Sequence, residues 1–137
     1  PLVAPGELRL AGGSGAWREI VLLGPGSKPG RRLFPMTARL LDRVPGAGSL
    51  ARHPAGCGNA IFSRIDAGTH LQAHCGPTNA RLTCHLGLDI PAGCEIRVGA
   101  ERRRWEEGKC IVFDDSWEHE VWNDSDRART VLLVNFW

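Results

Sequence analysis

"RLTCHLGLDI", residues 81–90, alternates between polar and apolar side chains as a half-buried β-strand does. One parity holds Leu82, Cys84, Leu86 and Leu88, and the other holds Arg81, Thr83, His85 and Gly87. Successive side chains of a strand point to opposite faces, so the pattern predicts one apolar and one polar face. His85 lies on the polar face, where it either meets solvent or lines a pocket.

Similar short segments recur along the chain, mainly in its second half. Strands are expected at 16–23, 59–65, 70–74, 95–99, 102–105, 109–114, 117–122 and 129–136. Turn-forming stretches such as "CGPTN", "PAG", "EEG" and "NDSD" separate those of the second half. Many short strands at roughly 8–12-residue spacing indicate a β-sandwich or barrel. A parallel βαβ fold would need helices that this half does not contain.

The first part of the chain is less regular. Residues 1–15 are rich in Gly, Pro and Ala and are expected to form a linker, with one domain over 16–137. A short helix is expected at 36–43, stopped by Pro45 and Gly46, with loops at 24–30 and 46–58. The chain has no initiating Met and stops within the strand-like "TVLLVNFW", so we expect a domain truncated at both ends.

Composition excludes several classes of protein. A net charge of +2 is too small to favour nucleic acid or an anionic membrane surface as a partner. No apolar run reaches the roughly 20 residues that a transmembrane helix needs, and no signal peptide is evident. The five cysteines form no C-x-x-C pair, which disfavours a zinc ribbon. Cys84 and Cys110 have apolar neighbours and are expected to be small buried residues.

Two histidines are candidate metal ligands. His74 and His119 lie near the ends of separate predicted strands, where a jelly-roll barrel opens, and neutral imidazole suits Fe, Zn, Cu or Ni. His119 shares its strand parity with four apolar or acidic residues: Phe113, Asp115, Trp117 and Val121. However, Gly76 stands where a His-x-Asp/Glu motif would have its carboxylate. The residues alone leave open whether a metal binds here.

Two long stretches carry a family resemblance: "GTHLQAHCGPTNARLTCHLGLDIP" (68–91) and "WEEGKCIVFDDSWEHEVWND" (105–124). In order, spacing and identity they resemble the aspartyl/asparaginyl β-hydroxylases, and the similarity extends from about Trp17 to the end. These are Fe(II)- and 2-oxoglutarate-dependent oxygenases built on a double-stranded β-helix. The resemblance therefore implies an all-β, jelly-roll or cupin-like fold with a short N-terminal helix.

The resemblance also assigns the site. It implies that His74 and His119 bind Fe(II), and that Gly76 takes the place of the usual carboxylate, as in the aspartyl hydroxylases. The distal carboxylate of the cosubstrate 2-oxoglutarate would pair with Arg129 and the hydroxyl of Ser63. His85 would contact the carboxylate next to the iron, where O2 also reacts. With one anionic ligand fewer, iron is expected to bind weakly without 2-oxoglutarate and more strongly with it.

One position departs from the family pattern. Close relatives of the aspartyl hydroxylase type have an arginine where this chain has Thr83, so cosubstrate affinity or substrate class is expected to differ. Arg81 has the same parity and is a possible substitute, and Val121 is a further possible pocket residue. Asp114 and Asp115 are expected to shape the turn "FDDS" by bonds to the backbone. The tryptophans expected to pack in the sheet are Trp105, Trp117 and Trp122, of which Trp122 could instead line the pocket mouth.

The leading hypothesis is hydroxylation of the β-carbon of Asp or Asn in a polypeptide, for example an EGF-like domain, coupled to conversion of 2-oxoglutarate to succinate and CO2. More distant members of the family act on lipid or small-acid substrates. A non-catalytic β-helix that binds a ligand is the second hypothesis. A zinc hydrolase is disfavoured, because zinc sites generally use three protein ligands and water. The compartment is left open.

Overall fold

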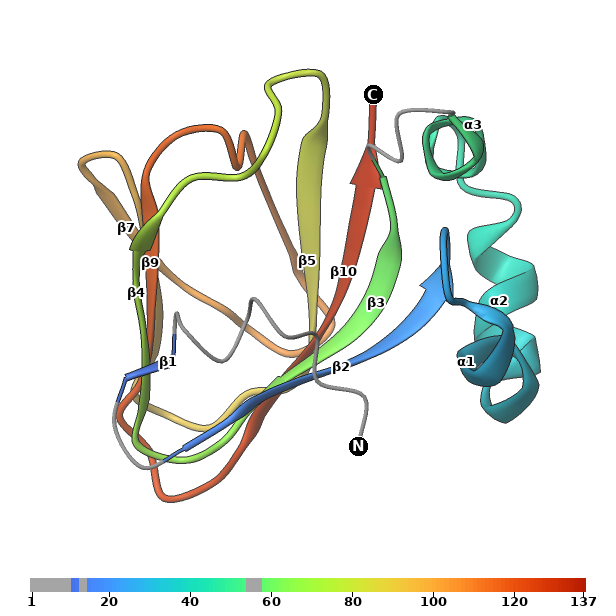
Figure 1. Cartoon of the computed structure of the whole chain (residues 1–137). Helices are drawn as coiled ribbons and strands as arrows, with labels where there is room; N and C mark the ends of the chain where they lie inside the picture. Colours follow the sequence, from blue (N-terminus) through green and yellow to red (C-terminus); the bar gives the residue numbers. More distant parts are fainter. Residues whose placement is uncertain (1–10, 13–14, 54–57) are drawn as a thin grey trace.

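The computed structural model describes residues 11–12, 15–53 and 58–137 and is built mainly from antiparallel strands. In chain order these are β1 (Ala11–Gly12), β2 (Trp17–Leu23), β3 (Ala60–Ile65), β4 (Thr69–His74), β5 (Leu82–Asp89), β6 (Cys94–Val98), β7 (Glu101–Arg104), β8 (Cys110–Phe113), β9 (His119–Asn123) and β10 (Arg129–Phe136). They form two five-stranded sheets, ordered β1-β4-β9-β6-β7 and β2-β3-β10-β5-β8. The sheets face each other across the interior (Figure 1), which confirms the predicted all-β fold.

The strand predictions are confirmed, with ends shifted by no more than a residue or two. The turn residues explain this agreement. Gly68 and Gly108 adopt positive φ angles of 63° and 75°, a backbone conformation that costs glycine little and other residues more. Because glycines of this kind form the turns between strands, the positions of the strand ends can be read from the sequence.

The polar face of β5 points into the molecule. Thr83 and His85 are buried, whereas Leu82 and Leu88 on the opposite face are 40% and 41% exposed. This is the reverse of the usual arrangement, in which the apolar face of a strand is buried. His85 therefore faces the interior of the molecule and not the solvent.

Three short helices lie against the outer side of the second sheet (Figure 1): α1 (Lys28–Leu33), α2 (Pro35–Leu41) and α3 (Ala47–Arg52). The helix expected at 36–43 is α2, but the loops expected at 24–30 and 46–58 were wrong where α1 and α3 form. Proline occupies the first turn of both α1 and α2, a position where its fixed φ and missing N–H favour helix initiation. The longest of these helices has seven residues, so none in the described ranges could span a bilayer.

The hydrophobic core has two parts. One fills part of the space between the sheets and includes Ile65, Leu71, Cys94, Ile96, Trp105, Val121 and Val131. The other joins the helices to the outer face of the second sheet and includes Leu22, Leu23, Leu41, Ala47, Ala51, Ala60 and Val134. The helices therefore cover apolar strand residues that face away from the interior, and polar residues are left to face inward.

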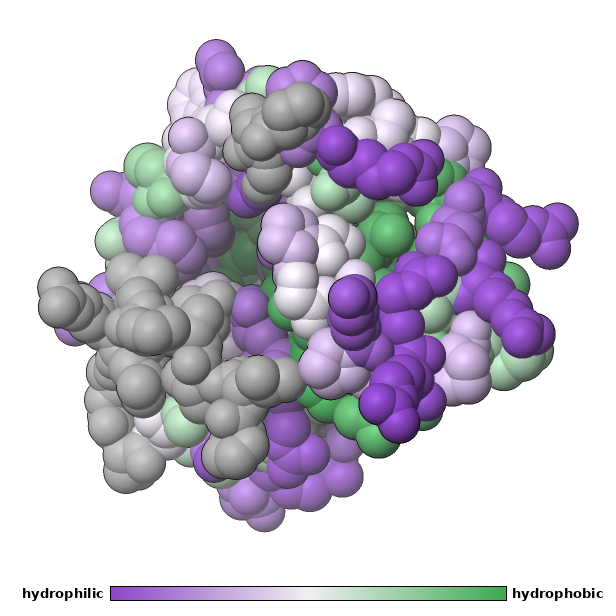
Figure 2. Space-filling view, turned by 45° about the vertical axis from the view of Figure 1, so that its right-hand side comes forward, coloured by the Kyte–Doolittle hydropathy of each residue, from purple (hydrophilic) through white to green (hydrophobic). Residues whose placement is uncertain are grey.

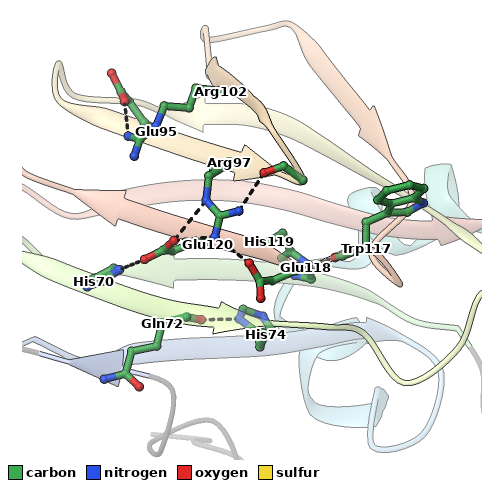
Figure 3. Close-up of polar contacts among 11 residues, drawn as sticks. His70, Gln72, His74, Glu95, Arg97, Arg102, Trp117, Glu118, His119 and Glu120 are labelled. Carbon is green, nitrogen blue, oxygen red and sulfur yellow. Dashed lines mark hydrogen bonds and ion pairs between the residues drawn. The ribbon is translucent and has the colours of Figure 1, made fainter.

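The outer face of the first sheet is polar. The guanidinium of Arg97 donates to Glu120 at 2.8 Å and to Glu118 at 3.0 Å, and His70 Nε2 lies 2.7 Å from Glu120 Oε1 (Figure 3). Trp122 stacks on His70 with ring centroids 5.2 Å apart, so it lies on this face and not at the pocket mouth. Exposed ion pairs of this kind contribute only about 0–1 kcal/mol each, so this network marks a solvated surface. In Figure 2 the side of the molecule that carries the helices is turned forward, and hydrophilic and hydrophobic side chains are mixed on that face.

Three smaller expectations need correction. Trp117 is 64% exposed, because the turn before β9 breaks the period-two pattern of the strand. Cys110 is exposed and Cys84 is only half-buried, since both lie on the outer face of the second sheet. Most of the expected linker 1–15 lies outside the described residues, but Ala11–Gly12 pairs with β4.

Candidate functional site

A cavity of about 310 Å³ opens between the two sheets. Its wall includes all eight side chains that the sequence singled out: Ser63, His74, Arg81, Thr83, His85, His119, Val121 and Arg129. Seven of them come from the two sheets, β3, β5 and β10 on one side and β4 and β9 on the other, and Arg81 directly precedes β5. The fold thus brings together residues that are far apart in the sequence.

Two imidazoles meet at one edge of this cavity. His74 on β4 is paired in register with His119 on β9, and their ring centroids lie 4.2 Å apart. Such cross-strand partners have closely spaced Cβ atoms, so strand pairing alone places the rings side by side. The separation allows both nitrogens to bind one ion, since metal–imidazole bonds are about 2 Å long.

The orientation of both rings suits a metal. His74 Nδ1 lies 2.7 Å from the carbonyl of Gln72, and His119 Nδ1 lies 2.9 Å from that of Trp117 (Figure 3). A carbonyl only accepts, so each Nδ1 carries the proton and each Nε2 keeps a lone pair. Backbone bonds of this kind are the usual way in which metal-binding histidines are oriented. Burial, and to a smaller extent the neighbouring His74, lower the pKa of His119, which favours its neutral, metal-binding form.

The position of the missing carboxylate is filled by another residue. A Cβ atom on Gly76 would lie 2.7 Å from Cγ of Asp115, and the Gly76 N–H donates to the Asp115 carbonyl at 2.6 Å. A side chain at position 76 would therefore collide with Asp115. Among the described residues there is no cluster of three or more His, Cys, Asp or Glu side chains placed to bind a metal. Of the described residues, the two imidazoles are the candidate metal donors at this edge.

The expectation for the "FDDS" turn was half right. Asp114 accepts a bond from the backbone N–H of Ser116 at 2.9 Å, as predicted. Asp115 instead points into the cavity wall and pairs with Arg81, with Nη2 and Oδ2 2.6 Å apart and both side chains mostly buried. Arg81 therefore lines the cavity, as was suggested, but its charge is balanced there by Asp115.

Arg129 is a deeply buried charged group in the cavity wall. It is 1% exposed, and neither Nε nor Nη1 has a hydrogen-bond partner in the described part of the chain. Burial lowers the pKa of this guanidinium to about 10, which still leaves it charged at neutral pH. A buried charge without a counter-ion is costly, whereas an anion in the cavity would supply both charge and acceptors. Arg129 therefore marks a candidate anion-binding site.

His85 lies in the same part of the cavity. It is 6% exposed, and neither of its ring nitrogens has a partner among the described residues. Burial, followed by the nearby charges of Arg129 and His119, holds the pKa of His85 well below its usual value of about 6.5. His85 is thus a neutral imidazole that can donate one hydrogen bond and accept another.

The buried neutrality of His85 predicts how stability depends on pH. The unfolded chain takes up a proton near pH 6.5, whereas folded His85 does not, so the free energy of unfolding should fall as the pH drops from about 7.5 to 5.5. One such group contributes a slope of at most about 1.4 kcal/mol per pH unit. His119 acts in the same direction, so replacing His85 should reduce the slope without abolishing it. Urea unfolding of the parent and H85F across this range measures the effect, and equal slopes would contradict it.

The remaining polar groups of the cavity are hydrogen-bonded. Ser63 accepts a bond from the indole Nε1 of Trp17 at 2.9 Å. Thr83, which replaces the arginine expected from the resemblance, accepts from Asn135 Nδ2 at 2.9 Å, and both are buried. Asn135 Oδ1 in turn accepts from the backbone N–H of Asn59 at 3.1 Å. These side chains form an uncharged polar part of the wall, and the carboxylate residue Glu19, the strand partner of Ser63, also lines the cavity.

Sequence reasoning missed three of these residues. Trp17 and Asn135 lie in apolar strands, where an aromatic or amide side chain gives no sign of facing a cavity. Asp115 shares its strand parity with His119, and this parity was a signal in the sequence that Asp115 could face the cavity. Its ion pair with Arg81 was not predictable, because the partners lie on different segments that only the fold brings together.

Comparison with known proteins identifies the family. The sequence model described as aspartyl/asparaginyl beta-hydroxylase matches residues 5–137. The chain is 45% identical over 106 residues to the human aspartyl/asparaginyl beta-hydroxylase, covering 75% of this chain and 13% of that protein. It is 38% identical over 125 residues to the ornithine lipid ester-linked acyl 2-hydroxylase of Rhizobium tropici, covering 88% of this chain and 41% of that protein. The chain thus spans less than half the length of either relative.

Solved structures agree on the fold. The Cupin_2 domain of an XRE family transcriptional regulator from Enterobacter cloacae matches 59% of this chain and 82% of that one, with a TM-score of 0.50 and 12% identity. The Cnp3 cupin domain of Schizosaccharomyces pombe matches 61% and 58%, with a TM-score of 0.50 and 13% identity. At these identities the likeness concerns the jelly-roll fold alone. By the match over nearly its whole length, the chain belongs to the aspartyl/asparaginyl β-hydroxylase family.

Proposed function

We propose that this chain is an Fe(II)- and 2-oxoglutarate-dependent oxygenase that hydroxylates a carbon atom. The observation that carries the proposal is buried Arg129, which has no anionic partner among the described residues and shares a cavity with His74 and His119. A dicarboxylate would supply the charge and acceptors that this guanidinium lacks, and Arg is well suited to binding a carboxylate with two hydrogen bonds.

His74 and His119 would hold the iron through their Nε2 atoms. Iron in such a site supplies O2 activation and couples the oxidative decarboxylation of 2-oxoglutarate to insertion of one oxygen atom into a C–H bond. The chain's own part is to orient both imidazoles, through the backbone carbonyls of Gln72 and Trp117. With two protein ligands, several coordination positions remain for the cosubstrate and O2.

The cosubstrate would lie between Arg129 and the histidine pair. Arg129 and the hydroxyl of Ser63 would bind one carboxylate, and the neutral ring of His85 would donate a bond to the other. Apolar wall residues, including Ile61, Phe113, Val121 and Leu133, limit the access of water to this space. Exclusion of water strengthens the contacts between Arg129 and an anion.

The favoured substrate is the β-carbon of Asp or Asn, which the names of the human and mouse relatives support. A polypeptide such as an EGF-like domain would present that residue. A second candidate is an ester-linked acyl chain. It is favoured by the similarity to the Rhizobium tropici lipid hydroxylase, which extends over 88% of this chain. Both substrates require oxidation of a carbon close to a carbonyl group.

An activity assay tests the proposal. The chain is incubated with Fe(II), 2-oxoglutarate and ascorbate, together with Asp- or Asn-containing peptides or micelles of an acylated ornithine lipid. We expect succinate formation and the mass gain of one oxygen atom in one substrate class, with both signals lost in H119A. Absence of iron-dependent turnover with every substrate, despite binding of 2-oxoglutarate, would instead favour a non-catalytic binding domain.

A further inference from the structure

Trp105 contacts two residues of the anion site without lining the cavity. It lies between β7 and β8 and is 3% exposed. Its ring lies 4.4 Å from Cζ of Arg129, and it stacks on His85 with centroids 5.9 Å apart and planes 22° from parallel. A single indole therefore supports both the guanidinium and the imidazole.

Hydrogen bonds do little to fix these two side chains, although the ring of Phe113 also meets that of His85 edge-on, with centroids 5.0 Å apart. Nε and Nη1 of Arg129 and both ring nitrogens of His85 lack hydrogen-bond partners in the ranges that the structure describes. An arginine side chain without hydrogen bonds can adopt many rotamers, and ordering it on binding costs affinity. The face of a tryptophan attracts a guanidinium electrostatically, and this attraction is larger when both are desolvated, as they are here.

Backbone contacts between β5 and the segment after Trp105 fix the position of Trp105. The Gly87 N–H donates to the Lys109 carbonyl at 3.0 Å, and the Gly108 N–H donates to the Gly87 carbonyl at 2.9 Å. A Cβ atom on Gly87 would lie only 2.3 Å from the Glu106 carbonyl oxygen. The segment after Trp105 therefore packs directly on the backbone of β5, two residues from His85, and glycine is required for that approach.

We propose that Trp105 is the positioning residue of the anion site, whose ring holds Arg129 and His85 in the orientation that one dicarboxylate needs before it binds. The identity of that dicarboxylate as 2-oxoglutarate rests on the proposed function. Because Trp105 acts on binding and touches no reacting atom, its loss should raise the KM for 2-oxoglutarate and leave kcat nearly unchanged.

The first test is calorimetric titration of metal-free protein with 2-oxoglutarate and with succinate. W105L removes the ring and should weaken binding roughly tenfold, whereas W105F keeps an aromatic face and should weaken it only about two- to threefold. The control is W122L, which removes the equivalent contact of Arg102 with Trp122, also 4.4 Å, on the outer face. Unchanged affinity in W105L would overturn the proposal.

A second variant separates the loss of the ring's attraction for the guanidinium from any misfolding of W105L. Fluorinated tryptophan placed at position 105 keeps the shape of the ring and weakens its attraction for a cation stepwise. Binding should weaken with each added fluorine, whereas a purely structural role predicts no trend and would overturn the proposal.

A ligand-free measurement separates this proposal from the proposed function. In the parent protein the Arg129 Nε–H resonance should be shifted by the ring current of Trp105 and protected from exchange, and W105L should lose both properties. If the parent binds neither dicarboxylate, the proposed function fails, and this resonance still decides the role of Trp105. An Arg129 resonance identical in the parent and W105L would refute that role.

Discussion

Replacing Arg129 with methionine should make the ligand-free protein as stable as the parent or more stable, while abolishing its stabilisation by 2-oxoglutarate. The buried guanidinium has no counter-ion among the described residues, so its removal relieves a desolvation cost. Replacing buried ionic groups with apolar ones of similar size is often neutral or stabilising by about 1–4 kcal/mol. The same change removes the cation that would bind the dicarboxylate, so affinity should fall by about 100-fold or more.

Thermal unfolding with and without 2-oxoglutarate measures both effects. The matched control is R97M, because Arg97 is paired with Glu118 and Glu120 on the outer face. R97M should change stability little, because exposed ion pairs contribute little, and should keep the shift caused by 2-oxoglutarate. If R129M instead lost stability and still responded to 2-oxoglutarate, the anion site would lie elsewhere.

The second large effect is expected at the histidine pair. H74A and H119A should each reduce metal affinity and turnover by about 100-fold or more, since each would remove one of the two candidate donors among the described residues. The control is H70A on the same strand, since His70 bonds to Glu120 on the outer face. Binding of Mn(II), followed by its paramagnetic resonance signal, should be unaffected by H70A. Equal Mn(II) affinity in H119A and the parent would exclude this site.

Much of the fold was predictable because its strands are short and end at turn residues. The alternation over 81–90 predicted β5 and its two faces, but not which face is inside. In most sheets the apolar face is buried, and here it is directed outward while Thr83 and His85 face a cavity. That inversion depends on the second sheet and the helices, which a single strand pattern does not reveal.

The helices were the weakest part of the fold prediction. α1 and α3 form in segments rich in Gly and Pro, whose intrinsic helix propensity is low. They are held by packing on the second sheet: a Cβ atom on Gly30 would lie 2.1 Å from the Val21 carbonyl oxygen. Tertiary contacts override local preference there, so the sequence pattern of those segments predicted loops.

The candidate site likewise has one part that was predicted from the sequence and another that was not. The resemblance to a family supplied the positions of His74, His119 and Arg129, and the structure brings them to one cavity. The pairing of Asp115 with Arg81 and the contact of Trp105 with Arg129 depend on distances between separate strands and loops. Patterns within one segment carry no information about such contacts.

Calorimetric titration of Mn(II) into the parent protein, with and without 2-oxoglutarate, tests the central claim most directly. With two imidazoles and no protein carboxylate on the metal, we predict weak binding of Mn(II) alone and at least about tenfold tighter binding with the dicarboxylate present, because linkage makes each ligand strengthen the other. The same Mn(II) affinity in both titrations would contradict a shared site for metal and dicarboxylate.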